Sequence, residues 1–293
     1  YHHVSTDTPP STSISPEDFR KHLDYLQQNN FSVIPLDQML ETLQTGGQLP
    51  EKAIAITFDD GYISIYDTAF PMLQSYGFPF TLFLSTGPID RRQQSFMNWE
   101  QVKKMSEAGV IIANHMVEHP YMLDKGPGES EAQWISRLEN ELLTAEARIE
   151  QQTGQSHRYL AYPFGEFNAD IKTMLGANGF IGLAQNSGAI GVNSDFLSLP
   201  RFPLASIYAN IDTAKIKLDS KSFNVELMRP QSPITDIRNP SVTLKFNDGN
   251  YNLSQIGCFA NSQPLPMTWI DRDEGILLIQ PTEYYAGRRW RYL

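Results

Sequence analysis

The sequence predicts an α/β fold built on a parallel sheet, open or closed into a barrel, with a small all-β unit after it. Short, nearly all-apolar runs are typical of strands buried on both faces. These runs alternate with stretches of helical periodicity, which indicates parallel strands joined by helices. After about residue 220 the pattern changes to short alternating stretches, so we expect two domains in the 293-residue chain, residues 1–220 and residues 221–293.

Three of the apolar runs end in polar or conformationally special residues. Sites in α/β folds lie at the carboxyl ends of parallel strands. We therefore expect the residues that follow these runs to meet at one edge of the sheet. The runs and their followers are residues 53–58 with Asp59-Asp60-Gly61, residues 110–113 with Asn114 to Pro120, and residues 159–162 with Pro163-Phe164-Gly165.

Helix signals lie between the strands. Ser15 suits an N-cap, Pro16 suits a first turn, and the two acids that follow favour the helix dipole. The longest expected helix, residues 130–152, carries an apolar stripe and stops at Gly154. The other expected elements are helices over residues 36–43, 65–77, 99–108 and 169–177, and strands over residues 31–34, 79–84 and 180–184.

The last quarter of the chain has a different pattern. Prolines cluster between residues 230 and 240, and turn residues such as Asn247-Asp248-Gly249-Asn250 separate short apolar stretches. This predicts a small antiparallel sandwich with strands near residues 242–246, 257–259, 267–270 and 275–279. Its aromatic residues form either a carbohydrate platform or a core: Trp269, Tyr284, Tyr285 and Trp290.

Charge and composition exclude several classes of function. A net charge of −10 argues against a nucleic-acid or anionic-membrane partner, which a basic face would bind. No apolar stretch approaches the ~18 residues of a membrane span. The lone cysteine, Cys258, excludes an intramolecular disulfide and a cysteine-rich metal site. Because the chain opens at Tyr1 rather than Met, we expect it to be processed or trimmed. No export signal is visible in it, and a removed one would agree with the periplasmic or secreted location that we expect.

His115 and His119 are four residues apart. On a helical turn this spacing places both imidazoles on one face, where they can reach one metal ion. With a strand-end carboxylate they make a three-ligand set with an open position, as in hydrolytic zinc sites. Taken alone, the histidine pair is equally compatible with a structural role. Asp59-Asp60-Gly61, taken alone, is typical of a solvated turn.

In order, these motifs resemble the first three motifs of the polysaccharide deacetylases, the NodB-homology family or carbohydrate esterase family 4. The resemblance covers residues 1–210 and is greatest to a subgroup with an N-terminal Tyr-His-His segment and an added C-terminal β domain. It implies a distorted, incomplete (β/α) barrel of about seven strands. It also implies removal of acetyl groups from an oligo- or polysaccharide that contains N-acetylglucosamine.

The resemblance assigns a role to each matching residue. It implies that Asp59 is the general base and that Asp60, His115 and His119 hold one divalent ion, zinc, with cobalt or nickel as alternatives. It further implies that the backbone N–H of Phe164 belongs to the oxyanion hole.

Two positions depart from the family pattern. Met116 stands where the family has Ser or Thr, so a polar contact that steadies the metal ligands is either missing or supplied by Asn114 or Glu118. Ala161 stands where many members have Arg. We expect Arg201 to orient Asp59 instead, with Arg158 as the other candidate and a surface salt bridge as the alternative role of Arg201.

The family's Leu-x-His motif, which supplies the general acid, is not evident in this chain. His22 lies on a helix face beside apolar residues, and His157 precedes the third strand at its wrong end. We therefore expect His3, or else His2, to protonate the leaving amine. The alternative is that both belong to a frayed terminus.

Three aromatic residues near the expected site are assigned to substrate binding: Tyr62, Tyr162 and Trp99. Aromatic residues near helix starts also serve as core.

The leading function is thus a metal-dependent N-deacetylase. One alternative is a carbohydrate-binding protein that kept the fold without turnover, and another is an amidase that acts on a non-sugar C–N bond. A glycosidase is disfavoured, because carboxylates at the adjacent positions Asp59 and Asp60 are poorly placed to straddle a glycosidic bond at ~5–9.5 Å.

Overall fold

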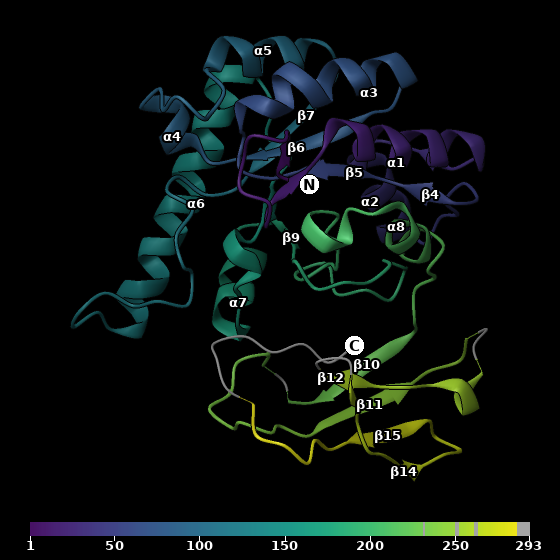
Figure 1. Ribbon diagram of the computed structural model, residues 1–293. Helices are drawn as coiled ribbons and strands as arrows, with labels where there is room; N and C mark the ends of the chain where they lie inside the picture. The colour runs from purple at the N-terminus through teal and green to yellow at the C-terminus, as the bar shows by residue number, and fades with distance from the viewer. Residues whose placement is uncertain (231, 250–251, 261–262, 286–293) are drawn as a thin grey trace. The chain divides into compact units, whose positions relative to one another are not determined.

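A computed structural model describes residues 1–230, 232–249, 252–260 and 263–285 (Figure 1). The chain forms two compact units, Tyr1–Lys221 and Ser222–Leu293. Trp290 lies outside the described residues. Each unit is described by itself below.

The first unit is built on a five-stranded parallel sheet whose strands follow one another in chain order. Successive strands pair in parallel, so each connection between them crosses over through helical segments. The sheet curls into a half-barrel, which confirms the predicted incomplete (β/α) barrel. The strands are β5 (Ile56–Phe58), β6 (Phe80–Leu84), β7 (Ile111–Asn114), β8 (Tyr159–Ala161) and β9 (Ile181–Leu183).

Two further parallel pairs extend this arrangement. β1 (His3–Val4) pairs with β2 (Ser13–Ile14), and β3 (Ser32–Val33) pairs with β4 (Ala53–Ile54). Only Ala55 separates β4 from β5, so the chain passes almost directly into the main sheet.

Helices cover the sheet (Figure 1), and neighbouring helices pack against each other, α1 on α3, α5 on α6 and α6 on α7. Ser15 and Ser130 cap α1 and α6 by accepting backbone N–H groups, and Gly154 ends α6 in the left-handed conformation at φ 74°. A π-helical turn, Ile65–Ala69, leads into α3. The helices are α1 (Pro16–Gln28), α2 (Leu36–Gln44), α3 (Phe70–Tyr76), α4 (Thr86–Asp90), α5 (Trp99–Glu107), α6 (Glu131–Thr153), α7 (Ala169–Ala177) and α8 (Ile211–Leu218).

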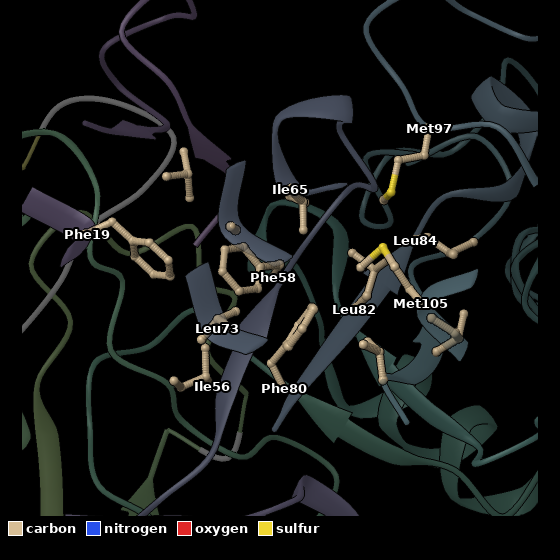
Figure 2. Close-up of a cluster of buried hydrophobic side chains, with 14 of the residues drawn as sticks. Phe19, Ile56, Phe58, Ile65, Leu73, Phe80, Leu82, Leu84, Met97 and Met105 are labelled. Atoms are coloured by element: carbon tan, nitrogen blue, oxygen red, sulfur yellow. The ribbon is translucent and has the colours of Figure 1, made fainter. Parts of the chain in front are cut away.

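The largest core cluster lies between β5, β6 and their covering helices (Figure 2). All five residues of β6 are buried, as expected for a strand covered on both faces. Each fully buried leucine or phenylalanine contributes about 1.5–3 kcal/mol through the hydrophobic effect, so this cluster fixes the strand ends that carry the site. Figure 2 labels Phe19, Ile56, Phe58, Ile65, Leu73, Phe80, Leu82, Leu84, Met97 and Met105.

The second unit contains antiparallel sheets, as the sequence predicted. Its main sheet has the order β10 (Val225–Arg229), β11 (Val242–Phe246), β15 (Ile276–Ile279) and β14 (Met267–Asp271). A second antiparallel pair consists of β12 (Phe259–Ala260) and β13 (Gln263–Pro264). Tyr285 belongs to the core of this unit and Trp269 packs against it, whereas Tyr284 is 79% exposed.

Candidate metal centre and active site

Asp59 and Asp60 follow β5, at the carboxyl end of the sheet. The backbone turns here through two left-handed residues, Asp60 at φ 75° and Gly61 at φ 91°. Gly61 also packs closely, because a Cβ at this position would lie 3.2 Å from Leu84 Cβ. The turn buries both carboxylates, which are 1% and 8% exposed. Burial of two acids requires compensating partners.

His115 and His119 come from the loop after β7, not from a helical turn. The expectation of an i, i+4 helical face was therefore wrong. Met116 at φ 66° and His119 at φ 52° turn the backbone twice through the left-handed region, and this brings the two rings together. His115 Nε2 lies 3.1 Å from Asp60 Oδ1, and His119 Nε2 lies 3.4 Å from the same oxygen.

The atoms that face one another in this cluster are acceptors. His115 Nδ1 lies 2.6 Å from the Ala161 carbonyl, so Nδ1 carries the hydrogen and Nε2 of the neutral ring presents a lone pair to Asp60. Within the described part of the chain, neither Asp60 Oδ1 nor His115 Nε2 has a hydrogen-bond partner. A cation between these atoms would satisfy both.

The donor set fits a divalent metal ion. One ligand atom from each of Asp60, His115 and His119 lies within 4.8 Å of the other two. Ligands about 2.0–2.1 Å from a tetrahedral zinc ion are roughly 3.3–3.4 Å apart, close to the two distances to Asp60 Oδ1. Burial and the neighbouring His115 lower the pKa of His119 to about 4, so its ring is neutral and offers a lone pair.

A proton competes for the same position. Burial acts to lower the pKa of His115, but Asp60 and Asp59 outweigh burial and raise it. A raised pKa favours protonation of His115 at Nε2, the atom that faces Asp60, so a proton and a metal ion would compete for this position. Metal binding would displace that proton.

Arg201 donates two hydrogen bonds to the Asp59 carboxylate, from Nη1 to Oδ1 at 2.7 Å and from Nη2 to Oδ2 at 2.8 Å. It also donates to the Ala184 carbonyl and to Thr57 Oγ1, which fixes the plane of the guanidinium. Burial acts to raise the pKa of Asp59, but Arg201, together with His115 and His2, outweighs burial and holds that pKa well below its usual range. The other candidate, Arg158, instead donates to the Asn178 carbonyl.

Of the two N-terminal histidines, His2 lies beside Asp59, with Nε2 4.0 Å from Oδ2. His3 is buried in β1, stacks on the Tyr62 ring at 3.7 Å and lies 3.5 Å from Ser64 Oγ through Nδ1. His2 is thus the one whose contact with Asp59 is seen, whereas the sequence analysis preferred His3, and the identity of the proton donor stays a prediction. Pairing of β1 with β2 also argues against a frayed terminus.

Phe164 lies in the turn Pro163–Gly165 after β8 and has a left-handed backbone at φ 57°. Its ring meets His119 edge-on at 4.3 Å and stacks on Tyr121 at 4.0 Å. Tyr121 is 48% exposed, so an aromatic surface leads from solvent to the histidine cluster. The assignment of the Phe164 N–H to an oxyanion hole stays a prediction.

A cleft of about 280 Å³ opens onto the cluster. Its walls combine aromatic, cationic and anionic side chains, a lining suited to a polar ligand with apolar faces. At one side Arg91 and Glu118 form a two-pronged ion pair at 2.5 and 2.8 Å. The lining residues are Asp60, Tyr62, Ser85, Pro88, Arg91, Gln93, Phe96, Glu118 and His119.

Residues 46–181 match the sequence profile of the polysaccharide deacetylase family. This segment belongs to that family. YxkH of Bacillus subtilis, assigned to the same family by name, is 24% identical over 202 residues, 69% of this chain and 68% of its own length. The poly-β-1,6-N-acetyl-D-glucosamine N-deacetylase of Escherichia coli K12 is 22% identical over 228 residues, 66% of this chain. The match covers only 34% of the E. coli enzyme's length.

Solved structures share the fold over three quarters of this chain. The Streptococcus pyogenes deacetylase PplD superposes with a TM-score of 0.67 at 20% identity, over 75% of this chain and 96% of that protein. IcaB from Ammonifex degensii superposes with a TM-score of 0.64 at 24% identity, over 75% and 95% of the two chains.

Two of the aromatic residues assigned to substrate binding, Tyr162 and Trp99, are not among the residues that line the cleft. Tyr162 is fully buried, donates its hydroxyl to the Leu197 carbonyl at 2.6 Å and packs on Phe167, so it is a core residue. Trp99 is absent from the cleft lining and donates its indole N–H to Asp90 at 2.7 Å. The third residue, Tyr62, does line the cleft.

Several cleft residues were missed from the sequence. Arg91, Gln93 and Phe96 lie in an irregular segment after α4, where no periodicity or motif marks them. Tyr121, which stacks on Phe164 and is not among the cleft-lining residues, was also missed although it follows His119-Pro120 directly in the sequence. Exposure of an aromatic ring beside a metal-ligand motif marks a candidate ligand contact.

As for membranes, none of the helices among the described residues combines the length and apolar composition needed to cross a bilayer.

Proposed function

We propose that the Tyr1–Lys221 unit is a metal-dependent N-deacetylase that removes acetyl groups from saccharides containing N-acetylglucosamine. The observation that carries this proposal is the buried set Asp60, His115 and His119, whose facing acceptor atoms call for a cation, beside the Arg201-held carboxylate of Asp59. The family match and the names of the E. coli and Staphylococcus epidermidis relatives support the reaction class.

The three ligands would hold one divalent ion, zinc or else cobalt or nickel. When bound, such an ion supplies Lewis-acid activation of water and of the acetyl carbonyl. Two imidazoles and one carboxylate leave a coordination position open for the reacting groups.

The chain's own residues perform the proton transfers. Asp59 accepts a proton from the water that attacks the acetyl carbon, and Arg201 keeps Asp59 ionised and oriented for this step. The Phe164 N–H donates to the carbonyl oxygen as negative charge develops there. His2 gives a proton to the departing nitrogen as the C–N bond breaks, which yields acetate and a free amine.

The substrate class follows from the cleft. Tyr62 and Phe96, which pack on each other, give the cleft an aromatic wall against which a sugar could lie, while Arg91, Gln93 and Glu118 offer hydrogen-bonding groups to hydroxyls. A saccharide with an acetamido group matches this combination better than a purely apolar amide. For the Ser222–Leu293 unit, carbohydrate binding stays a prediction, as does a periplasmic or secreted location.

Acetate release tests the proposal. The purified protein is incubated with N-acetylglucosamine oligosaccharides, with and without a chelator, and after zinc is returned. We expect release that the chelator abolishes and zinc restores. Asp60→Asn should abolish release, whereas Asp67→Asn, on an exposed acid of the same unit, should not. Shortened chains without acetate would indicate a glycosidase, and no turnover with retained sugar binding would indicate a binding protein.

A further inference from the structure

The loop that carries both histidines is tied to helix α6 by a buried amide–carboxylate pair. We propose that Asn114 and Glu146 are positioning residues that hold this loop, residues 115–119, in the conformation that binds the metal ion. The inference rests on the proposed function. It assigns a task to two buried polar residues that take no part in the proton transfers above.

Asn114 uses its whole side-chain amide. Its Nδ2 donates to the Leu142 carbonyl at 3.0 Å and to Glu146 Oε2 at 2.9 Å, and its Oδ1 accepts the Met116 N–H at 2.8 Å. Asn114 is the last residue of β7 and is fully buried, so water does not compete for these bonds. The amide therefore links the sheet, α6 and the loop that carries His115 and His119.

Glu146 is 7% exposed and receives donors on both oxygens. Oε2 accepts from Asn114, while Oε1 accepts the Ser156 hydroxyl at 3.0 Å and the Arg158 N–H at 3.1 Å. A buried carboxylate is costly unless such donors satisfy it. The position of Glu146 is thereby fixed, and it fixes the orientation of the Asn114 amide in turn.

The loop needs this support because its backbone is strained. Met116 has φ 66° and His119 has φ 52°, a region that disfavours residues other than glycine, and such strain persists only where the surroundings enforce it. Met116 carries no polar side-chain atom to hold the turn. Its N–H bonds to Asn114, and its carbonyl accepts the Thr86 N–H at 3.2 Å.

The same helix also holds the far end of the loop. Glu141 of α6 accepts the Glu118 N–H through Oε1 at 2.7 Å. Helix α6 therefore places one carboxylate, Glu146, on Asn114 just before His115, and another, Glu141, on Glu118 just before His119. Residues that orient metal ligands in this way change metal affinity by 10–100-fold when they are altered.

Zinc titration of the ion-free full chain against a chromophoric chelator tests the inference. Asn114→Asp keeps the acceptor for Met116 but turns a carboxylate oxygen toward Glu146 and the Leu142 carbonyl. We expect its zinc affinity to fall at least ten-fold. Glu146→Gln should cost less, because an amide can keep two of the three bonds. In the double variant, which combines Asn114→Asp with Glu146→Gln, the new amide on α6 can donate to the new carboxylate on β7, so affinity should recover toward that of the unsubstituted protein.

Glu150→Gln is the matched control, because Glu150 is an exposed glutamate on the same helix. Its zinc affinity should be unchanged. Thermal unfolding of each ion-free variant checks that the protein is folded, and Glu146→Gln serves as the second test if Asn114→Asp does not fold. Equal affinity in Asn114→Asp, Glu146→Gln and the control, or no recovery in the double variant, would overturn this inference alone. Absence of zinc binding by the unsubstituted protein would overturn the proposed metal dependence as well.

Discussion

At the scale of single residues, Asp59 and Asp60 show how neighbours in sequence acquire different tasks. Burial acts to raise the pKa of both carboxyls, but different partners oppose it and leave both pKa values lowered. Arg201 clamps Asp59 on both oxygens, whereas Asp60 faces His115 and His119. These different partners suit the roles proposed for the two residues, an ionised base of fixed orientation for Asp59 and a metal ligand for Asp60.

Arg201→Met should move the acid limb of the pH profile of kcat/KM to higher pH. With Arg201 present, the pKa of Asp59 lies far below neutrality, so Asp59 stays ionised as pH falls. Without the guanidinium, burial dominates and raises that pKa, so the base is protonated at a higher pH and activity is lost there. Rate measurements across the acidic and neutral pH range check this.

Arg158→Met is the control for this change, because Arg158 is exposed and contacts the Asn178 carbonyl. Its pH profile should match that of the unsubstituted enzyme. An unshifted acid limb in Arg201→Met would mean that Arg201 does not set the protonation of Asp59.

His2→Ala should lower kcat at least ten-fold, since general acids contribute about 10²–10⁴-fold. His3→Ala should leave kcat within a few-fold, because the His3 ring stacks on Tyr62 and not beside Asp59. Steady-state kinetics on one acetylated oligosaccharide measures both. A larger loss of kcat from His3→Ala would return the acid role to His3.

At the scale of elements, the site depends on the contacts of α4 and α6 with residues 115–119, the loop after β7 that carries His115 and His119. The N–H groups of Thr86 and Gly87 in α4 donate to the carbonyls of Met116 and Val117 at 3.2 and 2.9 Å. Ser85, just before α4, donates its hydroxyl to the His115 carbonyl at 2.9 Å. The loop therefore has little freedom to move away from Asp60.

Gly87→Ala should disturb this contact. A Cβ at residue 87 would lie 2.6 Å from Glu118 Oε1 and 2.8 Å from the Val117 carbonyl, so either α4 or the loop of residues 115–119 must shift. Overpacking of this kind costs about 1–3 kcal/mol. We expect a lower melting temperature and a loss of kcat/KM of at least ten-fold, measured by calorimetry and by acetate release.

Gly126→Ala is the matched substitution, because its Cβ would meet only Glu129 atoms at 3.6 Å or more. Both quantities should stay unchanged there. If Gly87→Ala were equally harmless, the packing of α4 would not control the loop.

The sequence allowed a correct prediction where residues directly follow parallel strands. Parallel strands must end at one edge, so Asp60 and His115 were predicted to meet. Prediction failed where side chains pair across long separations or point inward. Asn114 and Glu146 are 32 residues apart with no local signal for their bond. Tyr162 follows β8 next to the site residues, yet its ring turns into the cluster beneath α6 and α7.

At the scale of the whole molecule, the proposed catalytic residues all belong to the Tyr1–Lys221 unit. Three clusters lie within the first unit, and the fourth, built around Phe246, Leu277 and Ile279, lies within the second. Each unit therefore has a core of its own, as independently folding domains do.

A chain that ends at Lys221 should fold and keep its kcat on short acetylated oligosaccharides. The reason is that its core and its site lie within residues 1–221. Thermal unfolding and acetate release measure this. Loss of cooperative unfolding in the shortened chain would show that the second unit is needed for the fold of the first.

Anomalous diffraction at the zinc edge, on crystals grown with zinc, tests the metal centre most directly. One peak is expected about 2.0–2.2 Å from a carboxylate oxygen of Asp60 and from Nε2 of both His115 and His119. A zinc-loaded crystal with no peak between these three side chains would contradict the central claim.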